Sequence, residues 1–184
     1  MSLGNPRRTC PHRSHAIEYP DGTTIYASAS AFHWIDPSRP APDVGLWLDE
    51  SWSEHGEVIE WPDGGAPRDW DHARERIRGA FADGRDGARV EVGCIAAHGR
   101  TGTVLACMAI LAGVPPDEAI EWVGDHYCSK AVETGPQEHW IEWFAESVEV
   151  QGGSPRERSE RSNADPLPHR ATGEAGGPTS VRQQ

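Results

Sequence analysis

A cysteine and an arginine stand six residues apart in a segment rich in small and turn-forming residues. Residues 92–103 read Val-Gly-Cys-Ile-Ala-Ala-His-Gly-Arg-Thr-Gly-Thr, with the cysteine at 94 and the arginine at 100. The sequence predicts a short strand at 88–92 before them and a buried helix at 103–111 after them. A strand, a tight loop and a helix N-terminus direct backbone N–H groups and partial positive charge at an anion. Arg100 adds a planar fork that matches phosphate oxygens, and such surroundings would hold Cys94 as the attacking thiolate.

Two further features lie on either side of this segment. Residues 61–67 read Trp-Pro-Asp-Gly-Gly-Ala-Pro, a sequence whose prolines and glycines predict a defined loop carrying Asp63. Gln137 comes just before the last predicted helix. Together with Cys94 and Arg100, these residues would provide a nucleophile, an acid, a cationic anchor and a group that orients water, as phosphate-ester hydrolysis requires.

The three features resemble those of cysteine-dependent protein-tyrosine phosphatases. Cys94 to Gly102 resembles the Cys-x5-Arg-Thr-Gly phosphate loop of that family, and 61–67 resembles its acid loop, Trp-Pro-Asp-x-Gly-x-Pro. Gln137 is similar to the family's water-positioning glutamine, and the three features occur in the family's order. The resemblance covers roughly residues 44–144, with room between Asp63 and Cys94 for one helix and one strand.

The resemblance implies a role for each of these residues. Cys94 would be the nucleophile, and Asp63 would protonate the leaving oxygen and later act as base. Thr101 would donate a hydrogen bond to the Cys94 sulfur, and Gln137 would orient the attacking water. The substrate phosphate would be bound by the loop residues Ile95, Ala96, Ala97, His98, Gly99 and Arg100. This chemistry requires neither a metal ion nor a cofactor.

Two residues depart from the family pattern. Gly93 stands where the family has a histidine that helps to set the thiolate, so the pKa of Cys94 would be higher than in relatives. Ala97 stands where glycine is frequent, and a positive φ there would cost alanine on the order of 1 kcal/mol. Neither change removes a group that takes part in the chemistry.

Each candidate also has a simpler structural interpretation. Cys94 could be a packed core cysteine, Asp63 could shape a turn, and Gln137 could merely begin a helix. His98 could be a second acid or substrate contact, or it could face solvent at the loop tip. Cys107 and Cys128 are better explained by packing, because the spacing of the four cysteines suggests neither a zinc site nor a disulfide framework.

The favoured function is hydrolysis of a phosphate monoester through a cysteinyl-phosphate intermediate. The predicted substrate is a protein phosphorylated on tyrosine, with dual specificity left open because no separate phosphotyrosine-clamping motif is evident. Alternatives are a small phosphorylated metabolite, sulfur transfer or arsenate reduction with Cys128 as resolving thiol, and a non-catalytic phosphate-binding module. The absence of lysine between Ile95 and His98 favours an aryl phosphate over a phosphoinositide.

Charge and hydropathy limit the partners and the location. The chain has 184 residues and a formal net charge of −12, which argues against binding nucleic acid or an anionic membrane. No apolar run approaches the length of a membrane helix, and residues 1–8 lack the apolar core of a secretory signal. We therefore expect a reduced, cytoplasmic protein, whose oligomeric state the sequence does not indicate.

The order of predicted elements indicates an α/β domain with a small mixed sheet covered by helices. Strands are expected at 23–29, 44–48 and 57–61, and further helices at 67–81, 117–127 and from 137 onward. Three segments follow from this: a flexible N-terminal segment (1–17), a phosphatase-like catalytic domain (18–150) and a disordered C-terminal tail (151–184). The tail is predicted to be disordered because it has hardly any apolar residues.

Overall fold

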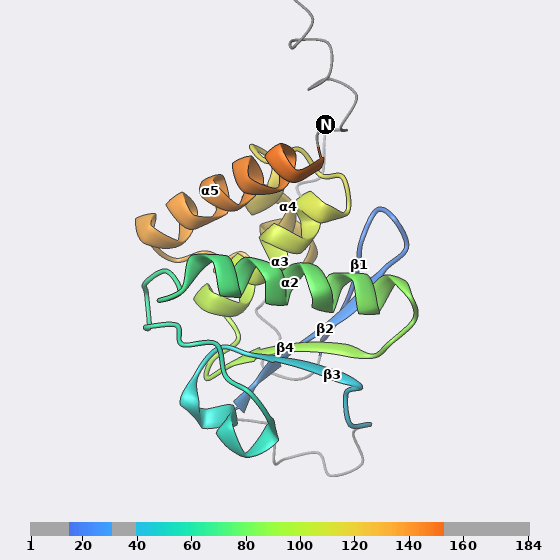
Figure 1. Cartoon of the computed structure of the whole chain (residues 1–184), viewed down its shortest axis with the longest axis vertical. Coiled ribbons are helices and arrows are strands. Elements are labelled where there is room, and N and C mark those ends of the chain that lie inside the picture. The colour runs from blue at the N-terminus through green and yellow to red at the C-terminus, as the bar shows by residue number, and fades with distance from the viewer. Residues whose placement is uncertain (1–14, 31–39, 153–184) are drawn as a thin grey trace, which may run out of the picture. The chain divides into compact units, whose positions relative to one another are not determined.

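The computed structural model describes residues 15–30 and 40–152, with side chains described up to residue 149 (Figure 1). In chain order the elements are β1 (His15–Glu18), β2 (Thr24–Ala29), β3 (Val44–Trp47), the 3-10 helix η1 (Glu50–His55), α2 (Trp70–Arg85), β4 (Val90–Cys94), α3 (Gly99–Leu111), α4 (Ala119–His126) and α5 (Gly135–Gly152).

The four strands form one mixed sheet in the order β1-β2-β4-β3. β2 and β3 both run parallel to the central β4, whereas β1 pairs antiparallel with β2 at the edge. The helices α2 to α5 gather on one side of this sheet (Figure 1). The predicted architecture, a small mixed sheet covered by helices, is confirmed.

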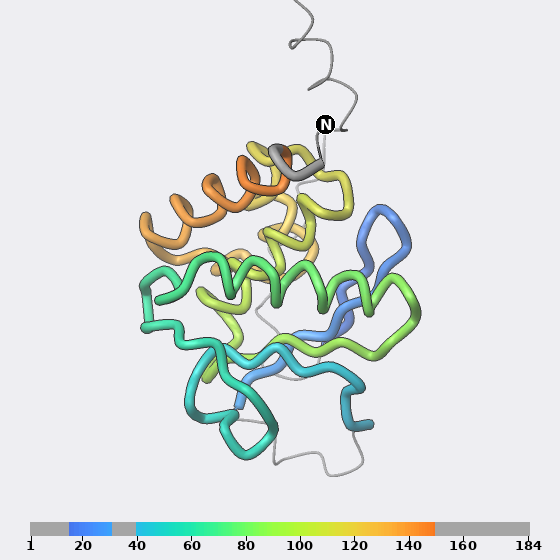
Figure 2. Tube along the Cα trace, in the orientation of Figure 1, coloured from blue at the N-terminus to red at the C-terminus, as the bar shows by residue number. Residues whose placement is uncertain are grey.

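Burial explains why β4 and α3 form the centre. Every residue of β4 is buried, and so are the α3 residues from Gly99 to Ala109. Parallel strands covered on both faces are apolar along their whole length, and β4 follows this rule apart from Glu91. Because β2, β3 and β4 are parallel, their carboxyl ends meet at one edge of the sheet, at Ala29, Trp47 and Cys94. Figure 2 traces how the chain after β3 passes close to the end of β4.

The helix boundaries differ slightly from the predicted ones. α2 begins at Trp70 rather than near Pro67, because Asp69 caps it: Asp69 Oδ1 accepts a hydrogen bond from the His72 N–H at 2.9 Å. It continues to Arg85, beyond the predicted end at Phe81.

Two expectations about strands were wrong. Residues 57–61 do not form the predicted strand, because only a single bridge joins Trp47 to Val58 before the chain turns away. Conversely, β1 begins at His15, inside the segment predicted to be flexible, and its Ile17 is buried. The weak alternation around one apolar residue did not predict a strand, but the exposed edge of β2 pairs with it. α5 also extends two residues into the predicted tail, whereas residues 1–14 and 153–184 lie outside the described residues.

Candidate active site

The loop after β4 is built around Cys94 and Arg100. Cys94 ends β4 and is 2% exposed, and Arg100 lies in the first turn of α3 and is 6% exposed. The hydrogen bond predicted from Thr101 to the cysteine is present, with Thr101 Oγ1 lying 3.1 Å from Cys94 Sγ. The loop thus joins a buried sulfur, a buried guanidinium and the N-terminus of a helix, which is the arrangement expected of an anion site.

The Arg100 guanidinium connects three segments at the carboxyl edge of the sheet. Its Nη1 donates to the carbonyl oxygens of Leu48 and Trp61, at 3.3 and 3.1 Å. Its Nη2 lies 3.2 Å from Asp49 Oδ2 and 3.2 Å from Asp63 Oδ1. The predicted acid Asp63 therefore lies at the mouth of the phosphate loop, where its side chain is 87% exposed.

Asp49 is a site residue that sequence analysis missed. Its Oδ2 accepts a hydrogen bond from the backbone N–H of Ile95 at 2.5 Å, in addition to its ion pair with Arg100. Its Oδ1 caps η1 by accepting from the Ser51 N–H at 2.9 Å. A carboxylate oxygen thus binds one amide of the phosphate loop and its arginine at once. Only its position after β3, at the edge where the parallel strands end, could have indicated it.

The acid loop is fixed at both ends. Trp61 is buried, donates from Nε1 to the Gly65 carbonyl at 2.7 Å, and packs edge-to-face against Trp140 with ring centroids 5.0 Å apart. Thr134 Oγ1 donates to the Gly64 carbonyl at 2.7 Å. These contacts tie the loop to the segment that begins α5, while the side chain of Asp63 is exposed and contacts Arg100.

Gln137 lies fully buried against the start of α3. Its Oε1 accepts from the Glu133 N–H at 2.8 Å, whereas its Nε2 has no hydrogen-bond partner among the described residues. A Cβ placed on Gly99 would lie 2.8 Å from that Nε2 and 2.4 Å from Glu133 Oε2. Gly99 therefore allows the amide of Gln137 to approach the phosphate loop. A buried amide donor of this kind requires an acceptor.

The remaining loop residues fall into different surroundings. Ile95 is 50% exposed, Ala96 is exposed, and Ala97 and Gly99 are buried. His98 is half-buried, with Nδ1 lying 3.5 Å from Cys128 Sγ, so it does not simply face solvent.

Ala97 has a φ of 54°, the positive value that the sequence analysis considered for this position. Tyr127, at the end of the helix predicted at 117–127, supports this strained backbone by donating from its hydroxyl to the Ala97 carbonyl at 2.5 Å. Burial, with a smaller effect of Cys94, raises the pKa of Tyr127, so that it remains a donor.

Gly93 is explained by aromatic packing. A Cβ at this position would lie 2.8 Å from ring atoms of Trp52 and 2.9 Å from Trp47 Cζ3. The two indoles stack with centroids 4.1 Å apart and an interplanar angle of 5°. The space that the family's histidine would need is therefore filled by this tryptophan pair.

The cysteines differ from expectation in one respect. Cys107 is a free, fully buried thiol, and burial raises its pKa, which agrees with a packing role. Cys128 is disulfide-bonded, contrary to the expectation of a reduced chain. Spacing could not indicate this, because cysteines far apart in sequence can meet in the fold.

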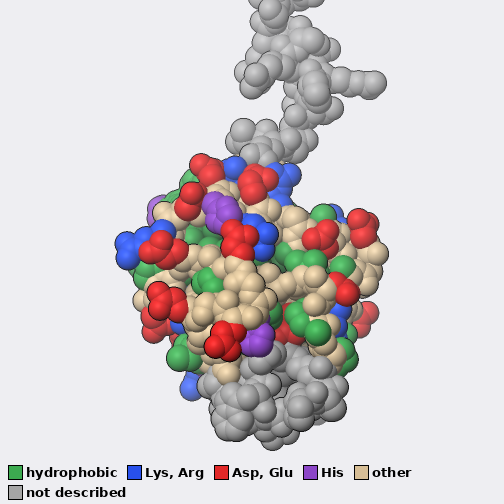
Figure 3. All heavy atoms as spheres, turned by 60° about the horizontal axis from the view of Figure 1, so that its bottom comes forward, with side chains coloured by type: hydrophobic (Ala, Val, Ile, Leu, Met, Phe, Trp, Pro, Cys, Tyr) green, Lys and Arg blue, Asp and Glu red, His purple; other side chains and the backbone are tan. Residues whose placement is uncertain are grey.

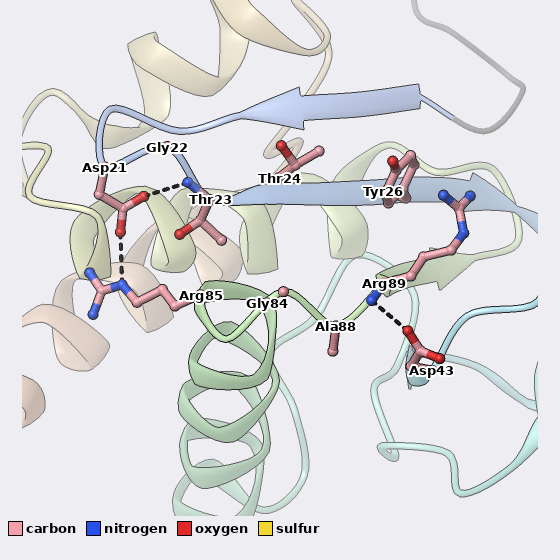
Figure 4. A pocket seen from close by; sticks show the side chains of 11 residues that line it. Asp21, Gly22, Thr23, Thr24, Tyr26, Asp43, Gly84, Arg85, Ala88 and Arg89 are labelled. Atoms are coloured by element: carbon pink, nitrogen blue, oxygen red, sulfur yellow. Dashed lines mark hydrogen bonds and ion pairs between the residues drawn. The ribbon is translucent and has the colours of Figure 1, made fainter.

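Two cavities lie at opposite edges of the sheet. One, of about 710 Å³, adjoins the phosphate loop and is lined by Asp49, Asp63, Ile95 and Arg100 among others. The other, of about 690 Å³, contains none of the predicted site residues (Figure 4).

Several polar groups of this second cavity are bound to one another, whereas the buried Nε of Arg89 has no hydrogen-bond partner among the described residues and its guanidinium lies over the Tyr26 ring. Arg85 Nε lies 2.7 Å from Asp21 Oδ2, and Asp43 Oδ2 accepts from the Arg89 N–H at 2.8 Å. Burial tends to raise the pKa of Asp21, but the Thr23 N–H and Arg85 outweigh it and lower that pKa. The candidate active site is therefore the cavity beside the phosphate loop.

Sequence comparison finds archaeal relatives from Methanocaldococcus jannaschii. The uncharacterized protein MJECL20 is 41% identical over 108 aligned positions, which cover 51% of this chain and 70% of that protein. The chain belongs to the family of this archaeal protein. The uncharacterized protein MJ0215 is 38% identical over 108 positions, which cover 51% of this chain and 65% of that protein. No protein-family model matches the chain.

Structural comparison finds phosphatases. Tk-PTP in its active form is 25% identical, with a TM-score of 0.55 over 71% of this chain and 96% of that one. The kinase associated phosphatase KAP, with its catalytic-site cysteine changed to serine, is 13% identical, with a TM-score of 0.56 over 78% of this chain and 99% of that one. The fold is thus shared with these phosphatases.

Within the described ranges, no helix has both the length and the apolar character that crossing a bilayer requires. The same part of the chain contains no group of three His, Cys, Asp or Glu side chains placed to hold a metal ion.

Proposed function

We propose that the protein hydrolyses phosphate monoesters through a cysteinyl-phosphate intermediate and acts on phosphotyrosine or another aryl phosphate. In the first step the Cys94 thiolate attacks phosphorus, the S–P bond forms and the bond to the leaving oxygen breaks. Asp63 donates its proton to that oxygen, and Arg100 with the loop amides holds the three non-bridging oxygens.

The second step regenerates the enzyme. Water attacks the phosphocysteine, Asp63 takes up a proton from it, and the S–P bond breaks to release phosphate and the thiolate. Gln137 would orient the water, and the hydrogen bond from Thr101 would stabilise the departing sulfur. The chemistry belongs to the chain's own side chains and requires no metal ion.

The observation that carries this proposal is the carboxylate bound in the loop. Asp49 Oδ2 accepts from the Ile95 amide and pairs with Arg100 Nη2. Charge-assisted contacts of these two kinds are those that a phosphate oxygen would make. The loop therefore has the donors of an anion site directly beside a buried cysteine, and the acid Asp63 reaches the same guanidinium.

The test is hydrolysis of para-nitrophenyl phosphate by the wild type and Cys94→Ser, each with and without excess chelator. We expect the serine variant to lose turnover, because its hydroxyl is not ionised at neutral pH, and to keep phosphate binding, because Arg100 and the amides remain. Chelator should leave the wild-type rate unchanged. Turnover by Cys94→Ser near the wild-type rate would refute the mechanism, and loss of activity with chelator would indicate a metallophosphatase.

A further inference from the structure

The cavity beside the phosphate loop has an apolar surface on which an aromatic ring could lie. Ile95 is the only large hydrophobic side chain that is well exposed in the part of the chain the structure describes. Half-buried Val58 and exposed Pro62 line the same cavity. An aryl group attached to a phosphate in the loop would find apolar contacts here.

The charged side chains of this cavity are mostly acidic. It is lined by four carboxylates, from Asp49, Glu50, Glu60 and Asp63, and by two guanidinium groups, from Arg68 and Arg100. Both guanidiniums already face carboxylates, because Arg68 Nε lies 3.1 Å from Glu60 Oε1 and Arg100 pairs with Asp49 and Asp63.

Glu50 is the carboxylate of this cavity whose charge is not balanced by a neighbouring guanidinium group of the described residues. It is exposed and makes no ion pair with any described residue. Beyond the phosphate loop itself, a substrate therefore meets excess negative charge. Acidic side chains are also prominent on the face shown in Figure 3. The experiment must therefore separate the effect of Glu50 on substrate binding from the effect of the acidic surface as a whole.

We propose that this cavity selects aryl phosphates whose attached chain is cationic, such as a phosphotyrosine flanked by basic residues. It would disfavour acidic flanks and multiply phosphorylated molecules, because a second anion would meet the excess negative charge of this cavity. The proposal rests on the proposed function and specifies its substrate class.

The experiment compares three phosphotyrosine peptides that differ only in the residues flanking the tyrosine: lysine, glutamine or glutamate. At low ionic strength we expect kcat/KM to fall in that order, by roughly threefold for each change, which is the size of effect that exposed charge pairs produce. The lysine-to-glutamate ratio of about tenfold should shrink with added NaCl, because salt screens exposed charges.

A matched pair of variants locates the effect. Glu50→Gln should lower the lysine-to-glutamate ratio about threefold, whereas Glu121→Gln, an exposed carboxylate on α4, should leave it unchanged. Equal changes in both variants, or a wild-type preference for acidic flanks, would overturn the inference. Para-nitrophenyl phosphate separates the two proposals: its hydrolysis together with peptide rates independent of flanking charge refutes only this inference, whereas its resistance to hydrolysis refutes the proposed function.

Discussion

Replacing Asp49 by asparagine tests whether the Asp49 carboxylate competes with phosphate for the hydrogen-bond donors of the phosphate loop. In the structure a phosphate would have to take over two donors that Asp49 Oδ2 now occupies, the Ile95 amide at 2.5 Å and Arg100 Nη2 at 3.2 Å. Asp49→Asn removes the charge and keeps the shape, including an oxygen that can accept from Ser51 at the start of η1. We expect the variant to bind inorganic phosphate more tightly than the wild type.

The magnitude follows from the position of the carboxylate. Two unit charges about 4 Å apart repel by about 1 kcal/mol in water and about 4 kcal/mol at an effective dielectric constant of 20. The Asp49 side chain is 13% exposed, but it borders an open cavity and can rotate as phosphate enters. We therefore expect the lower part of that range, about 1–2 kcal/mol, which corresponds to a Kd lower by roughly 5- to 30-fold.

The assay is calorimetric titration of phosphate into Cys94→Ser and into the double variant Cys94→Ser Asp49→Asn, where no turnover interferes. Asp43→Asn in the same background is a matched control. Asp43 precedes β3 and accepts from the Arg89 N–H before β4 (Figure 4). Asp49 is its counterpart at the other end of these strands, because it follows β3 and accepts from the Ile95 N–H after β4. The control should leave phosphate affinity unchanged, and the gain from Asp49→Asn should shrink in high salt.

Weaker phosphate binding by Asp49→Asn would refute this reasoning. It would mean that Asp49 acts mainly by holding Arg100 in its binding orientation, so that loss of the ion pair outweighs relief of repulsion. An equal gain in Asp43→Asn would instead assign the effect to net charge.

Two further substitutions test stability and catalysis. Gly93→Ala should lower the free energy of unfolding by about 1–3 kcal/mol in urea titrations, because its Cβ would overlap the rings of Trp47 and Trp52. Gly79→Ala, in α2 with open space around it, should instead raise that free energy by about 0.5–1 kcal/mol, and similar values for both would contradict the packing argument. Asp63→Asn should slow esters of poor leaving groups by about 10²–10⁴-fold and spare those of fluorinated phenols. Equal losses for all leaving groups would mean that Asp63 only shapes its loop.

Local patterns predicted the parts of the site that are continuous in sequence. The strand, loop and helix around Cys94 follow from one stretch, so the contact of Thr101 with the sulfur could be anticipated. The sequence identified the energetic cost of a positive φ at Ala97 but did not predict that φ, because the backbone conformation of a loop depends on the residues that pack around it. The Tyr127 hydroxyl, which donates to the Ala97 carbonyl, comes from the end of another helix. Nothing in the residues around Ala97 indicates this contact.

Features that depend on distant pairing were missed. Asp49 resembles any acidic residue after a strand, and only the parallel order of β3 and β4 brings it to the Ile95 amide. β1 depends on the free edge of β2 rather than on its own residues. The predicted strand at 57–61 failed for the opposite reason: its residues suit a strand, but only Val58 bridges to the sheet.

The glycine before the cysteine shows how packing on one face of the sheet constrains chemistry at its edge. Added Cβ atoms at Gly45 and Gly93 would overlap the Trp47 ring, so the flat indole pair requires glycine at both positions. In the proposed mechanism a side chain at position 93 therefore could not support the Cys94 nucleophile. That task would fall to groups on the loop side, namely the Thr101 hydroxyl, the backbone N–H groups and the N-terminus of α3. Sheet packing and support of the proposed nucleophile would thus come from opposite sides of Cys94.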